Sequence, residues 1–403
     1  MLLCRKSMAY VVGGAVMPHG ALVVDPRNFN GSENATDAAY ALHYASIEAG
    51  RFLQSLEPEV LLLVTPHGLA LQEPFLLYNN PAAAGSVSVD DWVPCSFPPC
   101  NYNATVRLDV HLTKHLESGL AGSGASVISL SGFGPPAEGT LPLPLAWAEV
   151  IPLYFIGRAY EPAPAQHGRG VQGAPPAESL DLGQRLRQGV DTARRLMSSA
   201  AARQRDVERE LRQRKSRRSL AQHGRGATSS ASAASAASIS AAAGTVGAAA
   251  AAISPNATMP RVVVLSVPSR RYEHSVQMIP ELLALGKALF TQLDSLDERI
   301  AVVVSGDLAH TWDPAGPYGY SDHAAVFDRA VTQWAHDLDR SALLKTAAKS
   351  VGEAKSCGFP GLVLLQGLMD SIKPDDMHSV LLEYGHPSYY GMMCAVFDFQ
   401  GDA

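Results

Sequence analysis

Two short apolar runs, each ending in the same three residues, constrain the fold of this chain more than any other feature. Residues 59–71 read E-V-L-L-L-V-T-P-H-G-L-A-L, and residues 10–20 read Y-V-V-G-G-A-V-M-P-H-G. Such a run is typical of a strand buried on both faces of a parallel sheet. Because proline cannot donate to a sheet ladder, each strand should end there. His19 and His67 are therefore expected just past the carboxyl ends of two central strands.

A third apolar run is also followed by a histidine, although without the Pro-His-Gly motif. Residues 299–305 read R-I-A-V-V-V-S, and Asp307 and His310 follow closely. Open α/β sheets bind their ligands in the crevice beyond the carboxyl ends of their strands. We therefore expect His19, His67 and His310 to contribute to one site.

The remaining ordered sequence alternates between helical and strand-like patterns. Helices are predicted at residues 30–55, 106–122, 279–293, 328–339, 342–350 and 359–369, the first of them capped by Thr36 or Asp37. Further strands are predicted at residues 125–130, 149–156, 261–267, 381–384 and 392–399. Pro152 makes residues 149–156 an edge or bulged strand. Residues 73–103 are rich in turn formers and read as a long loop or hairpin over the site.

This alternation predicts an α/β fold, with one mixed sheet covered by helices on both faces in a single domain over residues 8–400. The composition changes at residues 160–258, where Pro/Gly/Ala-rich sequence is followed by a basic stretch and then by Ala, Ser and Gly. Such sequence has little to bury, so we predict a low-complexity, disordered insertion within the domain. Its basic run is read as a solvated helix face rather than a nucleic-acid patch.

Composition limits the function classes. Of the 403 residues, 47% are hydrophobic and 17% charged, and the net charge of −6 gives no reason to expect nucleic-acid or membrane-surface binding. No run reaches the roughly 18 apolar residues of a membrane span, and the N-terminal segment is read as a strand rather than a signal peptide. Five cysteines predict no disulfide framework and a cytoplasmic location, although Cys95 and Cys100 could pair or bind metal.

The three histidines point to a metal site, because neutral imidazole is the commonest transition-metal ligand. His19 and His67 share one sequence setting and are read as ligands, whereas His310 differs and is read as a group for proton transfer. Glu353 and Cys357 are the best candidates for a third ligand. Taken singly, each of these residues also has an ordinary structural explanation, and the pattern leaves a metal hydrolase and a metal oxygenase equally open.

Taken together, these segments resemble the class III extradiol ring-cleavage dioxygenase family, whose catalytic domain is of the LigB type. The matching segments are residues 16–20 (V-M-P-H-G), 62–68 (L-L-V-T-P-H-G), 149–155 (E-V-I-P-L-Y-F), 268–285, 305–312 (S-G-D-L-A-H-T-W), 319–331, 353–364 and 389–396. Their order matches, and they span nearly the whole chain outside the insertion. The resemblance implies a mixed α/β fold, a non-haem Fe(II) cofactor and a catechol-type substrate opened with O₂.

Carried over residue by residue, the resemblance makes His19 and His67 the metal histidines and Glu353 the carboxylate ligand. It makes His310 the acid/base residue, with Asp307 orienting it. The expected partners are a small aromatic diol and O₂, with neither nucleic acid nor membrane; a homodimer is an open option. Zinc or another divalent metal is the alternative to iron.

Two departures from the family pattern keep a second function open. Several relatives have a further histidine before the V-I-P-L segment, where this chain has Leu145, Trp147 and Glu149. The C-G-F-P-G motif at residues 357–361 also resembles Memo-type relatives, which share the fold and use a cysteine as a metal ligand. That resemblance implies a metal-binding interaction protein without ring cleavage. A zinc-dependent hydrolase is the third, weaker hypothesis.

Overall fold

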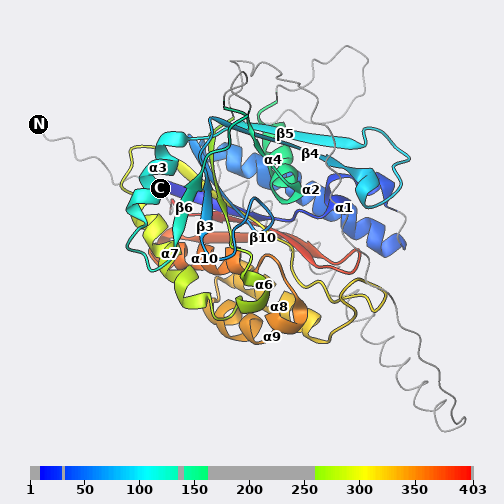
Figure 1. Ribbon diagram of the computed structural model, residues 1–403. Coiled ribbons are helices and arrows are strands. Elements are labelled where there is room, and N and C mark those ends of the chain that lie inside the picture. The colour runs from blue at the N-terminus through cyan, green and yellow to red at the C-terminus, as the bar shows by residue number, and fades with distance from the viewer. Residues whose placement is uncertain (1–9, 30–31, 135–139, 162–258, 401–403) are drawn as a thin grey trace, which may run out of the picture. The chain divides into compact units, whose positions relative to one another are not determined.

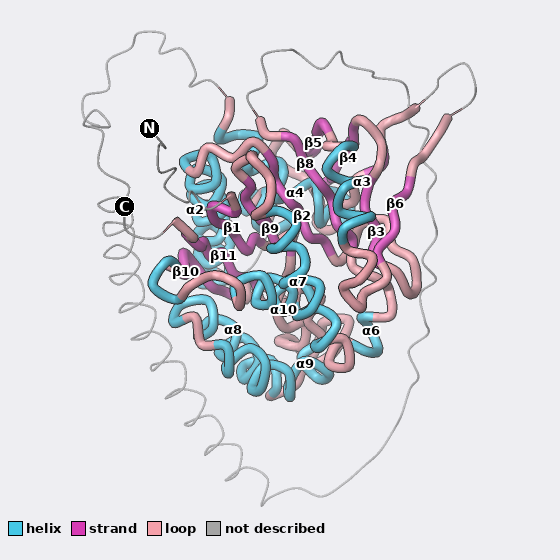
Figure 2. Tube along the Cα trace, turned by 90° about the vertical axis from the view of Figure 1, so that its left-hand side faces the viewer, coloured by secondary structure: helices cyan, strands magenta, loops and turns pink. Residues whose placement is uncertain are grey.

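A computed structural model describes residues 10–29, 32–134, 140–161 and 259–400 (Figures 1 and 2). The strands are β1 (Val11–Met17), β2 (Val60–Thr65), β3 (Phe75–Tyr78), β4 (Ala82–Ser88), β5 (Asn101–Arg107), β6 (Val127–Leu130), β7 (Leu143–Pro144), β8 (Arg261–Ser266), β9 (Ile300–Ser305), β10 (His378–Gly385) and β11 (Met392–Asp398). The helices are α1 (Ala21–Val24), α2 (Glu33–Ser55), α3 (Val110–Gly119), α4 (Trp147–Ala159), α6 (Arg271–His274), α7 (Ile279–Leu293), α8 (His323–Asp337), α9 (Ala348–Ala354) and α10 (Phe359–Met369).

Eight strands form one mixed sheet in the order β10-β11-β1-β9-β2-β8-β3-β6. Its centre is parallel, because β1 pairs with β9, β9 with β2 and β2 with β8 in the same direction. The pairs β10–β11, β11–β1 and β8–β3 are antiparallel. A second sheet of three short strands has the order β5-β4-β7. The carboxyl ends of β1, β9, β2 and β8 therefore lie side by side at one edge of the main sheet.

Helices cover both faces of the main sheet, which confirms the predicted fold class (Figure 1). Alternate residues of β1 separate into two apolar clusters: Val16 packs with α7, α8 and α10, whereas Ala15 and Met17 pack with α2, α4 and the small sheet. All six residues of β2 and all six of β9 are buried, as their unbroken apolar runs predict. Strand β8, which follows the 162–258 segment, pairs with β2 and β3, which precede it. The predicted insertion itself lies outside the described residues.

One predicted strand is wrong. Residues 149–156 lie within helix α4, which is buried along most of its length and contains Pro152. A continuous apolar run fits a buried helix as well as a buried strand, so the pattern did not separate them. The helix begins with the Glu149 carboxylate accepting a hydrogen bond from the Ala146 amide at 2.5 Å, which pairs an amide that the first helical turn leaves without a backbone partner.

One smaller expectation is corrected as well. Helix α2 is capped by Ser32, whose hydroxyl accepts from the Ala35 amide at 3.4 Å, rather than by Thr36 or Asp37. Of the two forms predicted for residues 73–103, the hairpin is the one found, formed by β4 and β5, and the segment also holds β3, which joins the main sheet. None of the described helices is both long and apolar enough to cross a membrane.

Candidate metal centre and cavity

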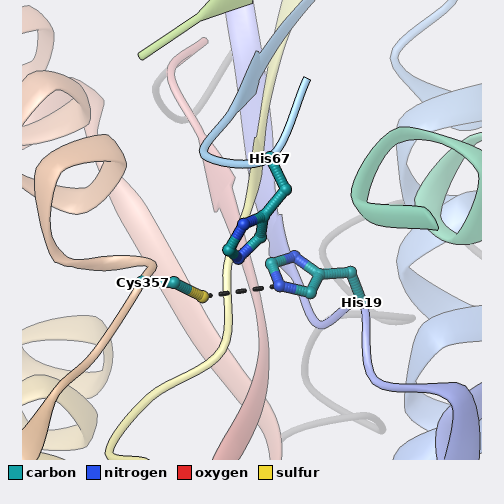
Figure 3. A group of neighbouring side chains, drawn as sticks. All are labelled: His19, His67 and Cys357. Atoms are coloured by element: carbon teal, nitrogen blue, oxygen red, sulfur yellow. Dashed lines mark hydrogen bonds between the residues drawn. The ribbon is translucent and has the colours of Figure 1, made fainter. Parts of the chain in front are cut away.

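Neighbouring strand ends bring the predicted residues together. His19 follows β1, Asp307 and His310 follow β9, and His67 follows β2, in the order in which these strands lie in the sheet. Cys357 comes from the turn that leads into α10. His19, His67 and Cys357 each offer a ligand atom, and these atoms all lie within 4.8 Å of one another. Figure 3 shows the three side chains pointing toward a common centre.

His19 is buried and held from several sides. Its amide donates to Asp307 Oδ1 at 3.0 Å, and its Nδ1 lies 2.9 Å from Ser305 Oγ. Its Nε2 faces Cys357 Sγ at 3.4 Å and Asp307 Oδ2 at 3.4 Å. Burial, together with the charges that His67, His310 and Arg271 can carry, holds the pKa of His19 well below its usual range. A neutral imidazole is the form that binds a metal.

His67 is half-buried and is held mainly by aromatic side chains. Its ring stacks on Trp147 with the centroids 5.0 Å apart, and its Nδ1 lies 3.3 Å from the Tyr272 hydroxyl. The Nε2 atom of His67 is therefore the one left for a ligand. Burial, with Arg271 and His310 nearby, lowers the pKa of His67 to about 3, so this ring is also neutral.

Cys357 completes the group, and Glu353 does not join it. The Cys357 side chain is buried, its Sγ accepts from the Asp307 amide at 3.4 Å, and burial raises the pKa of its thiol. The Glu353 side chain is exposed, while its carbonyl accepts from Thr311 Oγ1 at 3.2 Å. Helix α9 ends at Ala354, and Lys355 takes a left-handed conformation with φ of 60°. This reversal separates Glu353 from Cys357, which one continuous helix would have kept on the same face.

Asp307 lies beside His19 rather than orienting His310, which corrects its expected role. Besides the His19 amide, its carboxylate accepts from the Gly20 amide, and burial raises the pKa of Asp307 to about 7. Among the described residues, no hydrogen bond joins the Asp307 and His310 side chains.

His310 has a different setting from the two other histidines. Its Nε2 is buried and has no hydrogen-bond partner among the described residues, and burial lowers its pKa to about 4. Its amide donates to the Ala354 carbonyl at 2.7 Å. The ring contacts Tyr318, Tyr389 and Tyr390, with centroid distances of 5.7, 6.3 and 5.9 Å. His310 is thus positioned by backbone and aromatic contacts, with one polar atom uncommitted.

A cavity of about 320 Å³ opens beside these residues and is lined largely by aromatic rings. Its walls include His19, His67, Asp307, His310, Phe29, Trp92, Val93, Trp147, Tyr318, Tyr389 and Tyr390. One wall is a cross-linked loop, because Cys95 and Cys100 form a disulfide next to Trp92 and Val93. This pair is the one that the sequence left open, and a structure with a disulfide departs from the reducing pattern expected of its cysteines.

Both Pro-His-Gly segments require their glycine for close approach. A Cβ on Gly20 would lie 2.5 Å from the Tyr390 ring, and a Cβ on Gly68 would lie 2.4 Å from Glu149 Oε1. Glu149 is buried, its carboxylate accepts from the Tyr78 hydroxyl at 2.7 Å, and burial raises its pKa to about 7. Each candidate ligand is therefore followed by a glycine that packs directly against a buried polar or aromatic group.

The sequence reasoning did not assign a site role to Ser305, Tyr272, Trp147, Tyr318, Tyr389 or Tyr390. Ser305 ends a strand and Tyr272 follows one closely. Both positions could have been found by extending the strand-end rule from histidine to every polar side chain. Trp147 was noted only as a departure from the family's further histidine, and the structure shows that its ring stacks on His67.

Comparison with known proteins supports the family resemblance. The model of the catalytic LigB subunit of aromatic ring-opening dioxygenase matches residues 259–394, which include Asp307, His310 and Cys357, whereas His19 and His67 precede them. A crystal structure of an uncharacterized protein, JW3007 from Escherichia coli K12, is 10% identical over 87% of this chain and 92% of that one, with a TM-score of 0.37. At that score the likeness supports no conclusion. No curated protein matches the chain.

Proposed function

With residues 259–394 related to the catalytic subunit of aromatic ring-opening dioxygenases, we propose that this chain is a metal-dependent enzyme that opens a catechol-type ring with O₂. The observation that carries the proposal is His310 Nε2, a buried polar atom without a partner among the described residues, in an aromatic-walled cavity beside the His19, His67 and Cys357 group. A purely structural metal site needs neither a cavity nor an uncommitted histidine.

The donor set fits a transition metal. Three side chains converge within 4.8 Å, two of them are neutral imidazoles, and the third is a thiol that binds a metal as thiolate. Three protein ligands beside an open cavity are the arrangement of a catalytic rather than a structural site. When bound, Fe(II) or another divalent metal would supply a Lewis-acid centre for the two substrate oxygens and would activate O₂. Iron is the expected metal from the family, although the thiolate equally suits zinc or copper.

The chain's own residues supply the remaining functions. Trp147, Tyr318, Tyr389 and Tyr390 give flat walls that match an aromatic ring. His310 Nε2 is placed to take the proton of a substrate hydroxyl and to return a proton to oxygen during ring opening. The low pKa of His310, about 4, keeps its ring neutral at pH 7 and able to accept that proton.

The test is anaerobic reconstitution of the full chain with Fe(II), followed by a panel of catechols with O₂ uptake and the absorbance of ring-opened product as readouts. We expect O₂-dependent turnover that falls about 100-fold or more in His310→Gln, while that variant still binds metal. No turnover of any catechol by the iron-loaded protein would refute the proposal. Turnover that continues without O₂, in a zinc-loaded protein, would favour a hydrolase instead.

One observation favours a second candidate function. The third member of the group is Cys357 and not Glu353, and Memo-type relatives use a cysteine in this motif without established ring cleavage. A metal-binding interaction protein predicts bound metal, loss of metal in Cys357→Ser and no oxygen consumption with catechols. Glu353→Gln is the matched control, since its exposed side chain should leave metal content unchanged. Metal loss in Glu353→Gln with retention in Cys357→Ser would overturn the ligand assignment for both candidates.

A further inference from the structure

Helix α4 contains a proline whose position has a consequence for His19. In an α-helix the amide of residue 152 would donate to the carbonyl of residue 148, four residues earlier. Pro152 has no amide hydrogen, so the Ala148 carbonyl loses that donor. Ala148 is fully buried, and a buried carbonyl requires a partner. That partner is the Ser305 hydroxyl, which donates to the Ala148 carbonyl.

The same hydroxyl also contacts His19. Ser305 Oγ lies 2.9 Å from His19 Nδ1, in a site where both side chains are at most 2% exposed. A serine hydroxyl has one hydrogen, and it points at the Ala148 carbonyl, which can only accept. The contact with His19 is therefore a hydrogen bond in which Nδ1–H donates to Ser305 Oγ. A neutral imidazole protonated at Nδ1 carries its lone pair on Nε2.

We propose that Pro152 and Ser305 are positioning residues that fix the tautomer of His19, leaving its Nε2 lone pair directed at the candidate metal centre. That atom faces Cys357 Sγ at 3.4 Å, which makes Nε2 a nearer acceptor for the thiol hydrogen than the Asp307 carbonyl at 3.7 Å. The opposite tautomer would have to donate from Nε2 to Asp307 Oδ2, also 3.4 Å away and longer than ordinary N–H···O hydrogen bonds. We call this pair of hydrogen bonds the relay: Ser305 donates to the Ala148 carbonyl in helix α4, and His19 Nδ1–H donates to Ser305.

The relay gives an unusual expectation for Pro152→Ala. The new amide at position 152 competes for the Ala148 carbonyl and completes the helix, so thermal stability should not fall. Released from that carbonyl, the Ser305 hydroxyl can donate to Nδ1, and the proton of His19 moves to Nε2. Metal affinity should then drop about tenfold, as when an orienting partner of a metal-bound histidine is lost. This second effect rests on the proposed metal site, whereas the tautomer does not.

The experiment measures both effects on the full chain. Nitrogen-15 histidine NMR of the metal-free protein, with His19 assigned by its loss in His19→Gln, reports the tautomer, and Co²⁺ titration by absorbance reports affinity. We expect Nδ1–H in the wild type, a shift toward Nε2–H in Pro152→Ala, and no change in the control Pro280→Ala, whose proline stands in the first turn of α7. Nε2–H in the wild type, or a Pro152→Ala protein with unchanged tautomer, would overturn the inference.

Ser305→Ala keeps the inference testable if Pro152→Ala does not fold. Removing the hydroxyl takes away the acceptor for Nδ1–H, so His19 should show a mixture of tautomers in the metal-free protein. A Ser305→Ala protein that retains a pure Nδ1–H form would contradict the relay. Absence of Co²⁺ binding by the wild type would refute the proposed metal site and leave the tautomer assignment standing.

Discussion

The two Pro-His-Gly segments place the same residues at the ends of two strands, yet they hold their histidines differently. His19 is 2% exposed, and its ring and amide contact the buried polar groups Ser305 and Asp307. His67 is half-buried and is held by Trp147 and Tyr272, whose side chains are 41% and 65% exposed. One ligand is thus fixed inside the core, and the other is supported from the rim of the cavity.

Because of this difference, substitutions around the two histidines should affect folding stability and metal affinity to different extents. Groups that hold His19 are also part of the packed interior, so changing them should affect both folding and metal affinity. Groups that hold His67 lie mostly at the surface, so changing them should affect metal affinity almost alone. The chain segment at the carboxyl end of β9 accounts for the asymmetry, because its Ser305 and Asp307 both contact His19. Cys357, in the turn before α10, also lies 3.4 Å from His19 Nε2.

The largest expected effect comes from removing each histidine. His19→Ala and His67→Ala should both lower Co²⁺ affinity by about 100-fold or more, since each loses a ligand. His19→Ala should also lower the free energy of unfolding by about 2 kcal/mol, because Ser305 and Asp307 lose a buried partner. His67→Ala should change it by less than about 1 kcal/mol. Urea unfolding of the metal-free proteins checks the comparison, which fails if both variants lose equal stability.

A second prediction concerns the buried carboxyl behind the His67 segment. Burial raises the pKa of Glu149 from 4.5 to about 7 in the folded protein. Between pH 4.5 and 7, Glu149 is therefore protonated in the folded state and ionised in the unfolded state. The stabilisation that comes from the protonated carboxyl is fully present below pH 4.5. It should decline by about 3 kcal/mol as the pH rises toward 7 and stay constant above that.

Glu149→Gln removes this titration and supplies the control. Urea unfolding of wild type and variant from pH 4.5 to 8, without metal, gives the difference in unfolding free energy at each pH. The wild type should lose stability relative to the variant across pH 4.5 to 7. A difference that is flat over this window would show that Glu149 titrates normally in the folded chain.

Much of this asymmetry could not be predicted from the sequence, although most of the fold could. Long apolar runs specified β1, β2, β8 and β9, because burial on both faces leaves an unbroken apolar signature. The three strand-end histidines followed directly from those strands. Helix α4 was missed because a short apolar run with Pro152 carries no period that separates helix from strand.

The third member of the metal group shows a different limit. Glu353 and Cys357 stand four residues apart, so an uninterrupted helix would have presented both to the same centre. Lys355 is a non-glycine residue in the left-handed conformation, which short-range sequence patterns rarely signal. That single turn exposes Glu353 and buries Cys357. For Ser305 and Tyr272, the strand-end rule could have given their positions but not their hydrogen-bond partners, His19 and His67, which lie far away in the chain.

The smallest expected effect is the sharpest test of the rim-supported ligand. Arg271 is 5% exposed, contacts no carboxylate among the described residues, and donates to the Tyr272 hydroxyl at 2.7 Å. This fixes the phenol oxygen 3.3 Å from His67 Nδ1, where it can accept Nδ1–H when Nε2 holds a metal. Tyr272→Phe should therefore weaken Co²⁺ binding about tenfold and lower the urea midpoint less than Ser305→Ala does, since the only buried partner it removes among the described residues is an acceptor for Arg271.

Tyr320→Phe is the matched control, because Tyr320 is similarly exposed and donates to Asp322 rather than to a histidine. Ser305→Ala should lower both the affinity and the midpoint, since its hydroxyl serves two buried partners. If Tyr272→Phe binds Co²⁺ as the wild type does, the Tyr272 hydroxyl does not position His67. If it loses as much stability as Ser305→Ala, the distinction between a core-held and a rim-supported ligand fails, because the rim would then be as integral to folding as the core.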